Sequence, residues 1–97
     1  MVERRQTQRV ARVLEATWHA QSGAAPCRVT DISWQGCFVD AVNVPLINDD
    51  TDVTVKAGDR TVRLRGNVRY VEPRIGFGLQ FHPMTDSELA QMRAVLA

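Results

Sequence analysis

The sequence has no long hydrophobic run. No stretch of about eighteen apolar residues is present that could form a membrane-spanning helix, and the charged first residues are not followed by the apolar core of a signal peptide. Cysteines are few, and Cys27 and Cys37 match neither a Cys-x-x-Cys pair nor a His/Cys zinc pattern. We therefore expect a cytoplasmic protein with reduced, structural thiols, no membrane insertion and no bound metal.

The common motifs of enzymes are also missing. There is no Gly-rich phosphate loop, no nucleophile elbow and no paired acid and base at a recognisable spacing. His19 and His82 stand far apart, with no nucleophile or metal spacing near them. The cluster of Asp49, Asp50 and Asp52 lacks the glycine and the distal glutamate of a calcium loop. We expect no enzymatic activity and no cofactor, and we interpret the acidic cluster as a solvated turn.

The charge is small overall but unevenly distributed. The 97 residues carry a formal net charge of +1, which does not predict general adhesion to DNA or to anionic lipid. Residues 1–9, called the N-terminal arm below, are rich in arginine. The arginines among the first dozen residues are Arg4, Arg5, Arg9 and Arg12. This distribution favours a compact dianionic ligand over a long polyanion.

Most of the remaining chain alternates between apolar and polar residues, as half-buried β-strands do. The clearest alternation covers residues 61–71, in which Gly66 indicates a bend of the kind needed to close a sheet into a barrel. Alternate arginines of this segment are expected to face solvent. The residues expected on its core face are Val62, Leu64, Val68 and Tyr70.

Other segments complete a barrel and a helix. The further predicted strands span residues 10–19, 27–32, 37–40, 53–57 and 77–81. Residues 22–26 are expected to form a turn and residues 43–51 a surface loop, whereas Thr85 and Glu88 form the capping box of a terminal helix. The predicted fold is mainly β, a single domain over 1–97. It consists of the arm, a six-stranded antiparallel β-barrel over 10–82 and a C-terminal α-helix over 85–96.

Two short motifs carry chemistry that suits a nucleotide. Arg5 and Arg9 lie four residues apart, and their guanidinium groups offer forked donors that fit phosphate oxygens and the O6/N7 edge of guanine. Asp31, Ser33 and Gly36 form an Asp-x-Ser-x-x-Gly segment, in which the two polar side chains can bond the polar edge of a purine. A solvated basic tail and an ordinary capped turn are the alternative explanations.

In this order, ahead of a β-rich chain, the two motifs resemble those of the PilZ domain, a bacterial receptor module for cyclic di-GMP. The resemblance covers nearly the whole chain, including the last strand and the closing helix. It implies that Arg5 and Arg9 grip the phosphates and guanines of the ligand. It also implies that Asp31 and Ser33 bond a guanine, while Gly36 permits the tight turn.

Two further residues are weaker candidates for the same site. Arg4 is expected either to be solvated or to help hold a stacked, self-intercalated pair of ligands. Gly78 either borders the pocket or is a packing requirement within its strand. Among the aromatic residues only Trp34 is expected to be exposed, so the chain lacks the aromatic cluster of a stacking platform.

The resemblance implies a cyclic di-GMP receptor or adaptor in second-messenger signalling linked to motility and biofilm formation. We expect the free arm to be mobile, the ligand to fold it over the barrel mouth, and the new surface to meet an effector protein. The alternative is a nucleotide-independent PilZ-like adaptor in motility, pilus or exopolysaccharide machinery. A third possibility, a single-strand nucleic-acid barrel, is disfavoured because a solvated strand face better explains the remaining arginines. These arginines are Arg60, Arg63, Arg65, Arg69 and Arg74.

Overall fold

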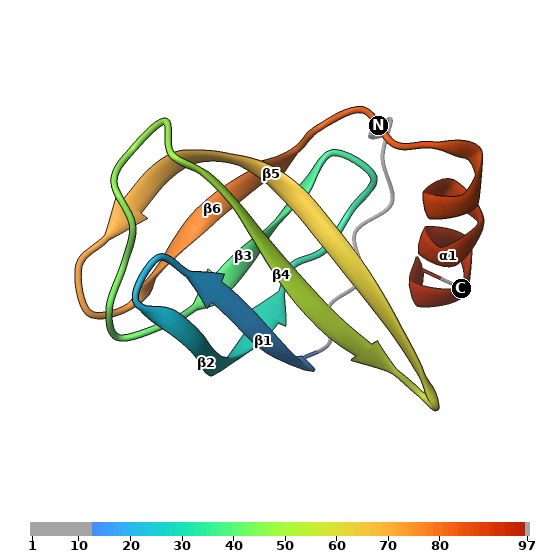
Figure 1. Cartoon of the computed structure of the whole chain (residues 1–97), viewed down its shortest axis with the longest axis horizontal. Helices are drawn as coiled ribbons and strands as arrows, with labels where there is room; N and C mark the ends of the chain where they lie inside the picture. The colour runs from blue at the N-terminus through green and yellow to red at the C-terminus, as the bar shows by residue number, and fades with distance from the viewer. Residues whose placement is uncertain (1–12, 97) are drawn as a thin grey trace, which may run out of the picture.

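The structure, a computed structural model, describes residues 13–96 and shows a closed antiparallel barrel with one helix at its end (Figure 1). The neighbouring strands follow the order β1-β2-β3-β6-β5-β4, and the pairing of β1 with β4 closes the ring. The elements are β1 (Leu14–Ala20), β2 (Gly23–Thr30), β3 (Gly36–Asp40), β4 (Asp50–Ala57), β5 (Arg60–Glu72), β6 (Gly76–Phe81) and α1 (Asp86–Leu96). The predicted six-stranded barrel with a C-terminal helix is therefore confirmed.

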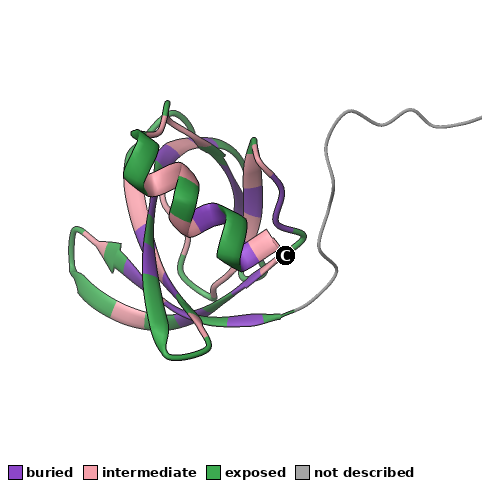
Figure 2. Ribbon diagram, turned by 90° about the vertical axis from the view of Figure 1, so that its right-hand side faces the viewer, coloured by how far each residue is buried: buried purple, intermediate pink, exposed green. Residues whose placement is uncertain are grey.

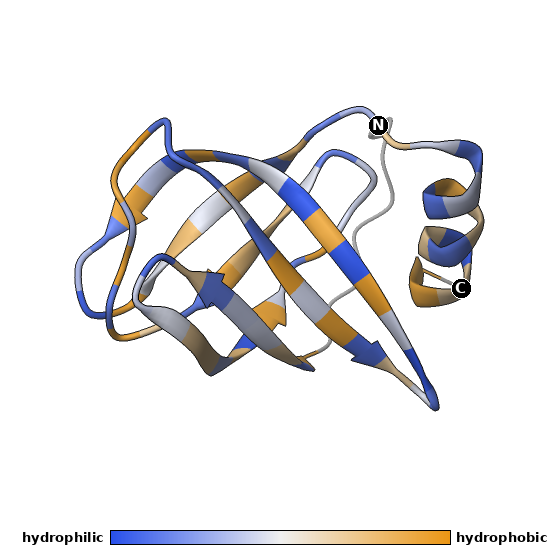
Figure 3. Cartoon of the chain, viewed as in Figure 1, coloured by the Kyte–Doolittle hydropathy of each residue, from blue (hydrophilic) through white to orange (hydrophobic). Residues whose placement is uncertain are grey.

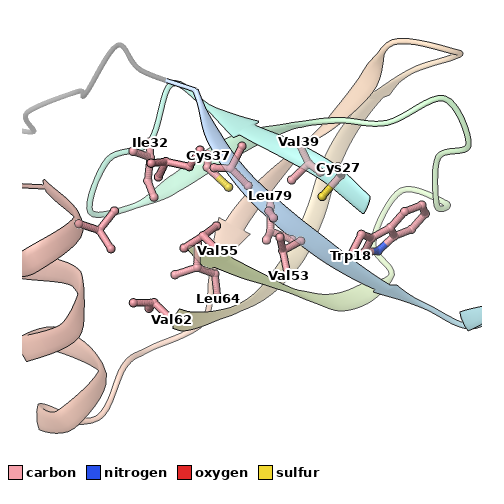
Figure 4. Packing of buried hydrophobic residues seen from close by; sticks show 14 of the residues in the cluster. Trp18, Cys27, Ile32, Cys37, Val39, Val53, Val55, Val62, Leu64 and Leu79 are labelled. Atoms are coloured by element: carbon pink, nitrogen blue, oxygen red, sulfur yellow. The ribbon is translucent and has the colours of Figure 1, made fainter. Parts of the chain in front are cut away.

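The interior of the barrel is filled by side chains from alternate strand positions (Figure 4). Val53 and Val55 of β4 are fully buried and pair with inward residues of β5. The ring of Trp18 packs near that of Phe77, with centroids 5.1 Å apart. Figure 4 shows Ile32 at the end of the core next to α1 and Trp18 toward the other end. Because burying one such aliphatic side chain contributes roughly 1.5–3 kcal/mol, this single core stabilises all six strands.

The alternation along β5 is interrupted by one extra residue. Val68 pairs with Leu79 of β6, but the register then shifts so that Tyr70 pairs with Gly78. Such a bulge reverses the faces of the residues that follow it, and Tyr70 is accordingly 49% exposed. The prediction that Tyr70 lies on the core face was therefore wrong, and the irregularity of this strand lies beyond Gly66.

The predicted turn over residues 22–26 was also wrong, because β2 already begins at Gly23. The chain reverses at Gln21 and Ser22, and Pro26 lies within the strand, paired with Thr17. A proline is tolerated there because β3 pairs with β2 only from Arg28 onward, so β2 is an edge strand at Pro26. Strand β1 begins at Leu14, and residues 10–12 of its predicted span lie outside the described residues.

The helix α1 begins with the predicted capping box. The N–H of Thr85 donates to Glu88 Oε1 at 2.8 Å, and the N–H of Glu88 donates to Thr85 Oγ1 at 3.2 Å. The first of these bonds, followed by the charge of Arg65, lowers the pKa of Glu88. Met92 and Val95 are buried against the barrel, and Figure 2, viewed from this side, shows the helix lying across its end. Within residues 13–96, no helix is long and apolar enough to cross a membrane.

Both thiols lie in the barrel wall as free cysteines. Cys27 and Cys37 are buried and unpaired with one another. Burial is the main cause that raises the pKa of Cys27 from 9.0 to about 11, and the carboxylate of Asp40 adds to the effect. Burial raises the pKa of Cys37 as well. Both side chains therefore act as small apolar core groups at neutral pH.

We predict that Met92→Ala lowers the free energy of unfolding by about 2–4 kcal/mol, because it leaves a cavity under the helix. Arg93→Ala, an exposed change on the next residue of α1, is the matched control and should cost no more than about 0.5 kcal/mol. Urea unfolding followed by tryptophan fluorescence measures both. Equal costs for the two variants would show that α1 does not depend on its buried face.

We also predict a pH dependence that originates from Cys27. Because the folded state raises this pKa, the neutral thiol stabilises the fold below about pH 9, and this contribution is lost as the pH rises toward about 11. The free energy of unfolding of the wild type should fall more steeply over this interval than that of Cys27→Ala, since Cys37 is common to both. Parallel urea titrations at several pH values test this, and identical slopes would contradict it.

Candidate functional site

The Asp-x-Ser-x-x-Gly segment forms the turn between β2 and β3. Asp31 is exposed, and its φ of 53° lies in the left-handed region, which aspartate adopts more readily than most residues. Ser33 is 7% exposed, and its N–H donates to the carbonyl oxygen of Gly36 at 2.9 Å. The Ser33 hydroxyl donates to the same oxygen at 3.4 Å and accepts from the N–H of Gln35 at 3.3 Å. The turn is thus held by its own polar groups and presents Asp31 on the surface.

The glycine of this motif is required by the close approach of two backbones. Gly36 pairs with Gln80 of β6, and a Cβ on Gly36 would overlap the carbonyl group of Leu79. Beside it, the carbonyl oxygen of Gln35 accepts a hydrogen bond from the N–H of Phe81 at 2.8 Å. Gly36 therefore lets the turn lie directly against β6, which fixes the position of the whole motif.

A groove of about 260 Å³ lies beside this turn, between residues of β3, β5 and β6. The predicted site residues that line it are Asp31, Ser33, Gly36 and Gly78. The other predicted site residues lie outside the described part of the chain and are Arg4, Arg5 and Arg9. The lining is completed by Gln35, Cys37, Phe38, Arg69, Tyr70, Leu79 and Gln80.

Two aromatic rings form part of the groove. Phe38 of β3 and Tyr70 of β5 are the register partners of Gly78, one on each side of β6. Their rings are stacked, with centroids 6.2 Å apart and planes inclined by 28°. A Cβ on Gly78 would overlap the ring of Tyr70. Gly78 therefore serves packing and also borders the groove, so both explanations offered for it apply.

Sequence reasoning missed Arg69 and Tyr70 as members of this site. Tyr70 is the exposed aromatic residue in the groove, whereas Trp34 is half-buried and packs against the core. The expectation that only Trp34 would be exposed was therefore wrong. The missed signal is a pair of glycines, Gly76 and Gly78, which leave the outer face of β6 bare and available to aromatic rings from the neighbouring strands.

Strand β1 begins close to the groove. Leu14, the first residue of β1, pairs with Val29, which lies two residues before Asp31. An extended chain spans at most about 17 Å over the five residues from Arg9 to Leu14. The register of β1 therefore places its first residue beside the Asp31 turn, and Arg9 precedes that residue by five positions in the sequence.

Arginines elsewhere on the barrel are partly neutralised. Arg63 forms an ion pair with Asp52 of the neighbouring strand, and Arg65 pairs with Glu88 at 3.3 Å. These pairs break up the positive stripe that a nucleic-acid-binding face would need. Among the described residues there is also no group of three or more His, Cys, Asp or Glu side chains that could hold a metal ion.

The closed barrel and its surface groove define a small β-barrel binding module. Comparison with protein families matches residues 3–97 to the PilZ domain, and the chain belongs to this family. PilZ domains are binding and adaptor modules that are generally associated with cyclic di-GMP binding and signalling. A comparison with curated proteins found no match.

We predict that Gly78→Ala displaces the ring of Tyr70 and costs about 1–3 kcal/mol of stability, as overpacking usually does. The cost should be largely removed in a Tyr70→Ala background, because the clashing ring is then absent. A double-mutant cycle measured by urea unfolding determines this coupling. If the costs of the two substitutions add, Tyr70 does not lie over Gly78.

Proposed function

We propose that this PilZ domain binds cyclic di-GMP and transmits the bound state to an effector protein. The observation that carries the proposal is the groove that unites Asp31, Ser33, Gly36 and Gly78 near the start of β1, which the arginine-rich arm precedes in the sequence. This groove adds Arg69 and Tyr70 to the motif residues. A purine has both a polar edge and a flat face, and the groove offers complementary groups for each.

The carboxylate of Asp31 supplies the base preference. It can accept hydrogen bonds from the N1 and N2 hydrogens of guanine, which adenine does not present in the same arrangement. The exposed ring of Tyr70 offers a surface for base stacking, which is worth about 1–3 kcal/mol per base. The exposed guanidinium of Arg69, on the adjacent residue, supplies donors for phosphate or for guanine O6 and N7.

The size of the groove supports a site that the arm completes. Its volume of about 260 Å³ is below the roughly 300–1,000 Å³ of pockets that enclose a whole small ligand. The groove therefore accommodates part of a dinucleotide, and the two phosphates need cations from elsewhere. Arg5 and Arg9 supply them when the arm closes over the ligand. Backbone ¹⁵N relaxation of the Gln8 and Arg9 amides measures this ordering, and unchanged relaxation at saturation would contradict it.

A nucleotide-independent adaptor is the second candidate, and one observation favours it. The hydroxyl of Ser33 is already engaged within its turn, with Gly36 and Gln35. The motif can therefore be explained as a structural turn that needs no ligand. Both contacts are long, at 3.4 and 3.3 Å, so the hydroxyl can exchange them for a shorter bond to a base, and we favour the receptor.

Calorimetric titration with cyclic di-GMP tests the proposal. The wild type should bind saturably, and Arg9→Ala should bind roughly 10- to 100-fold more weakly, because charge-assisted hydrogen bonds contribute about 1.5–3 kcal/mol. Arg60→Ala, an exposed arginine change at the start of β5, is the matched control and should leave the affinity unchanged. GMP and cyclic di-AMP should bind much more weakly than cyclic di-GMP.

Equal affinities of Arg9→Ala and Arg60→Ala for cyclic di-GMP would show that Arg9 of the arm does not contribute to ligand binding. An absence of binding in the wild type, by heat and by a second method, would support the adaptor instead. The stoichiometry of the same titration tests the role of Arg4. If Arg4 holds a stacked pair of ligands, Arg4→Leu should reduce two ligands per chain to one, and two ligands bound to this variant would contradict that role.

A further inference from the structure

Exposed apolar side chains gather at the end of the barrel opposite α1. The connection between β3 and β4 carries Val42, Leu46 and Ile47, which are 73%, 74% and 53% exposed. The β5–β6 turn adds Ile75, at 58% exposed, whose carbonyl oxygen accepts from the N–H of Ala41 at 3.1 Å. Figure 3 shows hydrophobic segments along this connection, at the left-hand end of the molecule. Clusters of exposed apolar side chains mark interaction sites in soluble proteins.

The loop that presents these side chains is held in place. The N–H of Leu46 donates to Asp49 Oδ2 at 3.1 Å, and the N–H of Asp49 donates to the carbonyl oxygen of Leu46 at the same distance. Asn48, with a φ of 75°, donates its N–H to the carbonyl oxygen of Val68 at 2.8 Å, and Asn67 Nδ2 donates to Asn48 O at 2.8 Å. The loop is therefore fixed to β5, so the exposure of its apolar side chains is built into the fold.

An acidic hollow adjoins the apolar side chains. It encloses about 690 Å³ between the ends of β1, β2, β3 and β4, and its lining contains three aspartates but no lysine or arginine. Asp52 is paired with Arg63. The carboxylate of Asp50 is 72% exposed, with His82 Nε2 at 3.2 Å. Asp49 and Asp50 thus place negative charge on the lining of the hollow, to which Val42 also belongs.

We propose that this end of the barrel, formed by Val42, Leu46, Ile47, Asp49 and Asp50 and called the loop-end surface, docks a basic segment of a partner protein. The segment has an aliphatic or aromatic anchor that contacts the apolar side chains, with lysine or arginine residues on either side that reach the carboxylates. Apolar burial supplies the attraction, and complementary charge selects the partner and its orientation.

Other occupants fit the loop-end surface less well. An anionic membrane would be repelled by its carboxylates. A second copy of the chain would place the same acidic patch opposite itself in a two-fold contact, which brings like charges together. A small molecule held in the hollow would leave Leu46 and Ile47 uncovered, because these residues lie outside its lining. The surface is also distinct from the groove, so the proposal stands whether or not the chain binds a nucleotide.

Nuclear magnetic resonance titration of the full chain with model peptides tests the proposal. The probe is a synthetic peptide with two leucines flanked by lysine pairs. One control peptide has glutamates in place of the lysines, and a second has serines in place of the leucines. The lysine–leucine peptide should shift the amide signals of residues 41–52 saturably at millimolar concentration, and both controls should bind much more weakly.

Matched variants of the protein make the test specific. Asp49→Asn/Asp50→Asn keeps one oxygen acceptor on each side chain but removes the charge, and it should weaken binding of the lysine–leucine peptide about fivefold or more. Asp59→Asn, an exposed change at the β4–β5 turn, should have no effect. Leu46→Ser should also weaken binding, whereas Val13→Ser, an exposed change just before β1, should not.

Several results would overturn the proposal. They are the absence of saturable shifts, shifts confined to the groove, equal binding of the glutamate peptide, and equal affinity in the Asp49→Asn/Asp50→Asn and Asp59→Asn variants. A loss of peptide binding in a variant counts only if its amide spectrum retains the dispersion of the wild type. The Asn and Ser variants are all surface changes, so this condition is readily met.

Discussion

The extra residue in β5 determines what the outer surface of the barrel presents. Without the bulge between Val68 and Tyr70, the tyrosine would point into a filled core, and Gly78 would lie bare on the outside. With it, the rings of Tyr70 and Phe38 flank Gly78, and a groove forms beside the Asp31 turn. One local irregularity therefore joins the packing of β6 to the chemistry of the candidate site.

The two ends of the barrel expose different kinds of residues, and β3 runs from one end to the other. The strand begins at Gly36 in the motif turn and ends at Asp40, shortly before Val42 in the apolar loop. The first end is covered by α1 and contains the start of β1, whereas the second exposes aliphatic and acidic side chains (Figures 1 and 3). The surfaces that we propose for a nucleotide and for a protein partner are therefore separate, as a module that relays a signal between the two requires.

Much of the fold was predictable because it follows from local patterns. The alternation up to Val68 and the capping box at Thr85 identified the long strand and the helix, since each depends on residues close in sequence. The bulge and the outward position of Tyr70 were not predictable, because they depend on how β5 fits against β6. Similarly, Pro26 suggested a turn, yet the unpaired edge of β2 at this position tolerates it.

The candidate site was likewise predictable only in part. The sequence around Asp31, Ser33 and Gly36 predicted the motif turn, but the groove also needs Arg69 and Tyr70 from a strand nearly forty residues further along the chain.

The most direct test of the proposed receptor function is to detect intermolecular nuclear Overhauser effects at saturating cyclic di-GMP. Our account predicts contacts between guanine H8 and the ring protons of Tyr70. Bound ligand that contacts only residues outside the groove would contradict it.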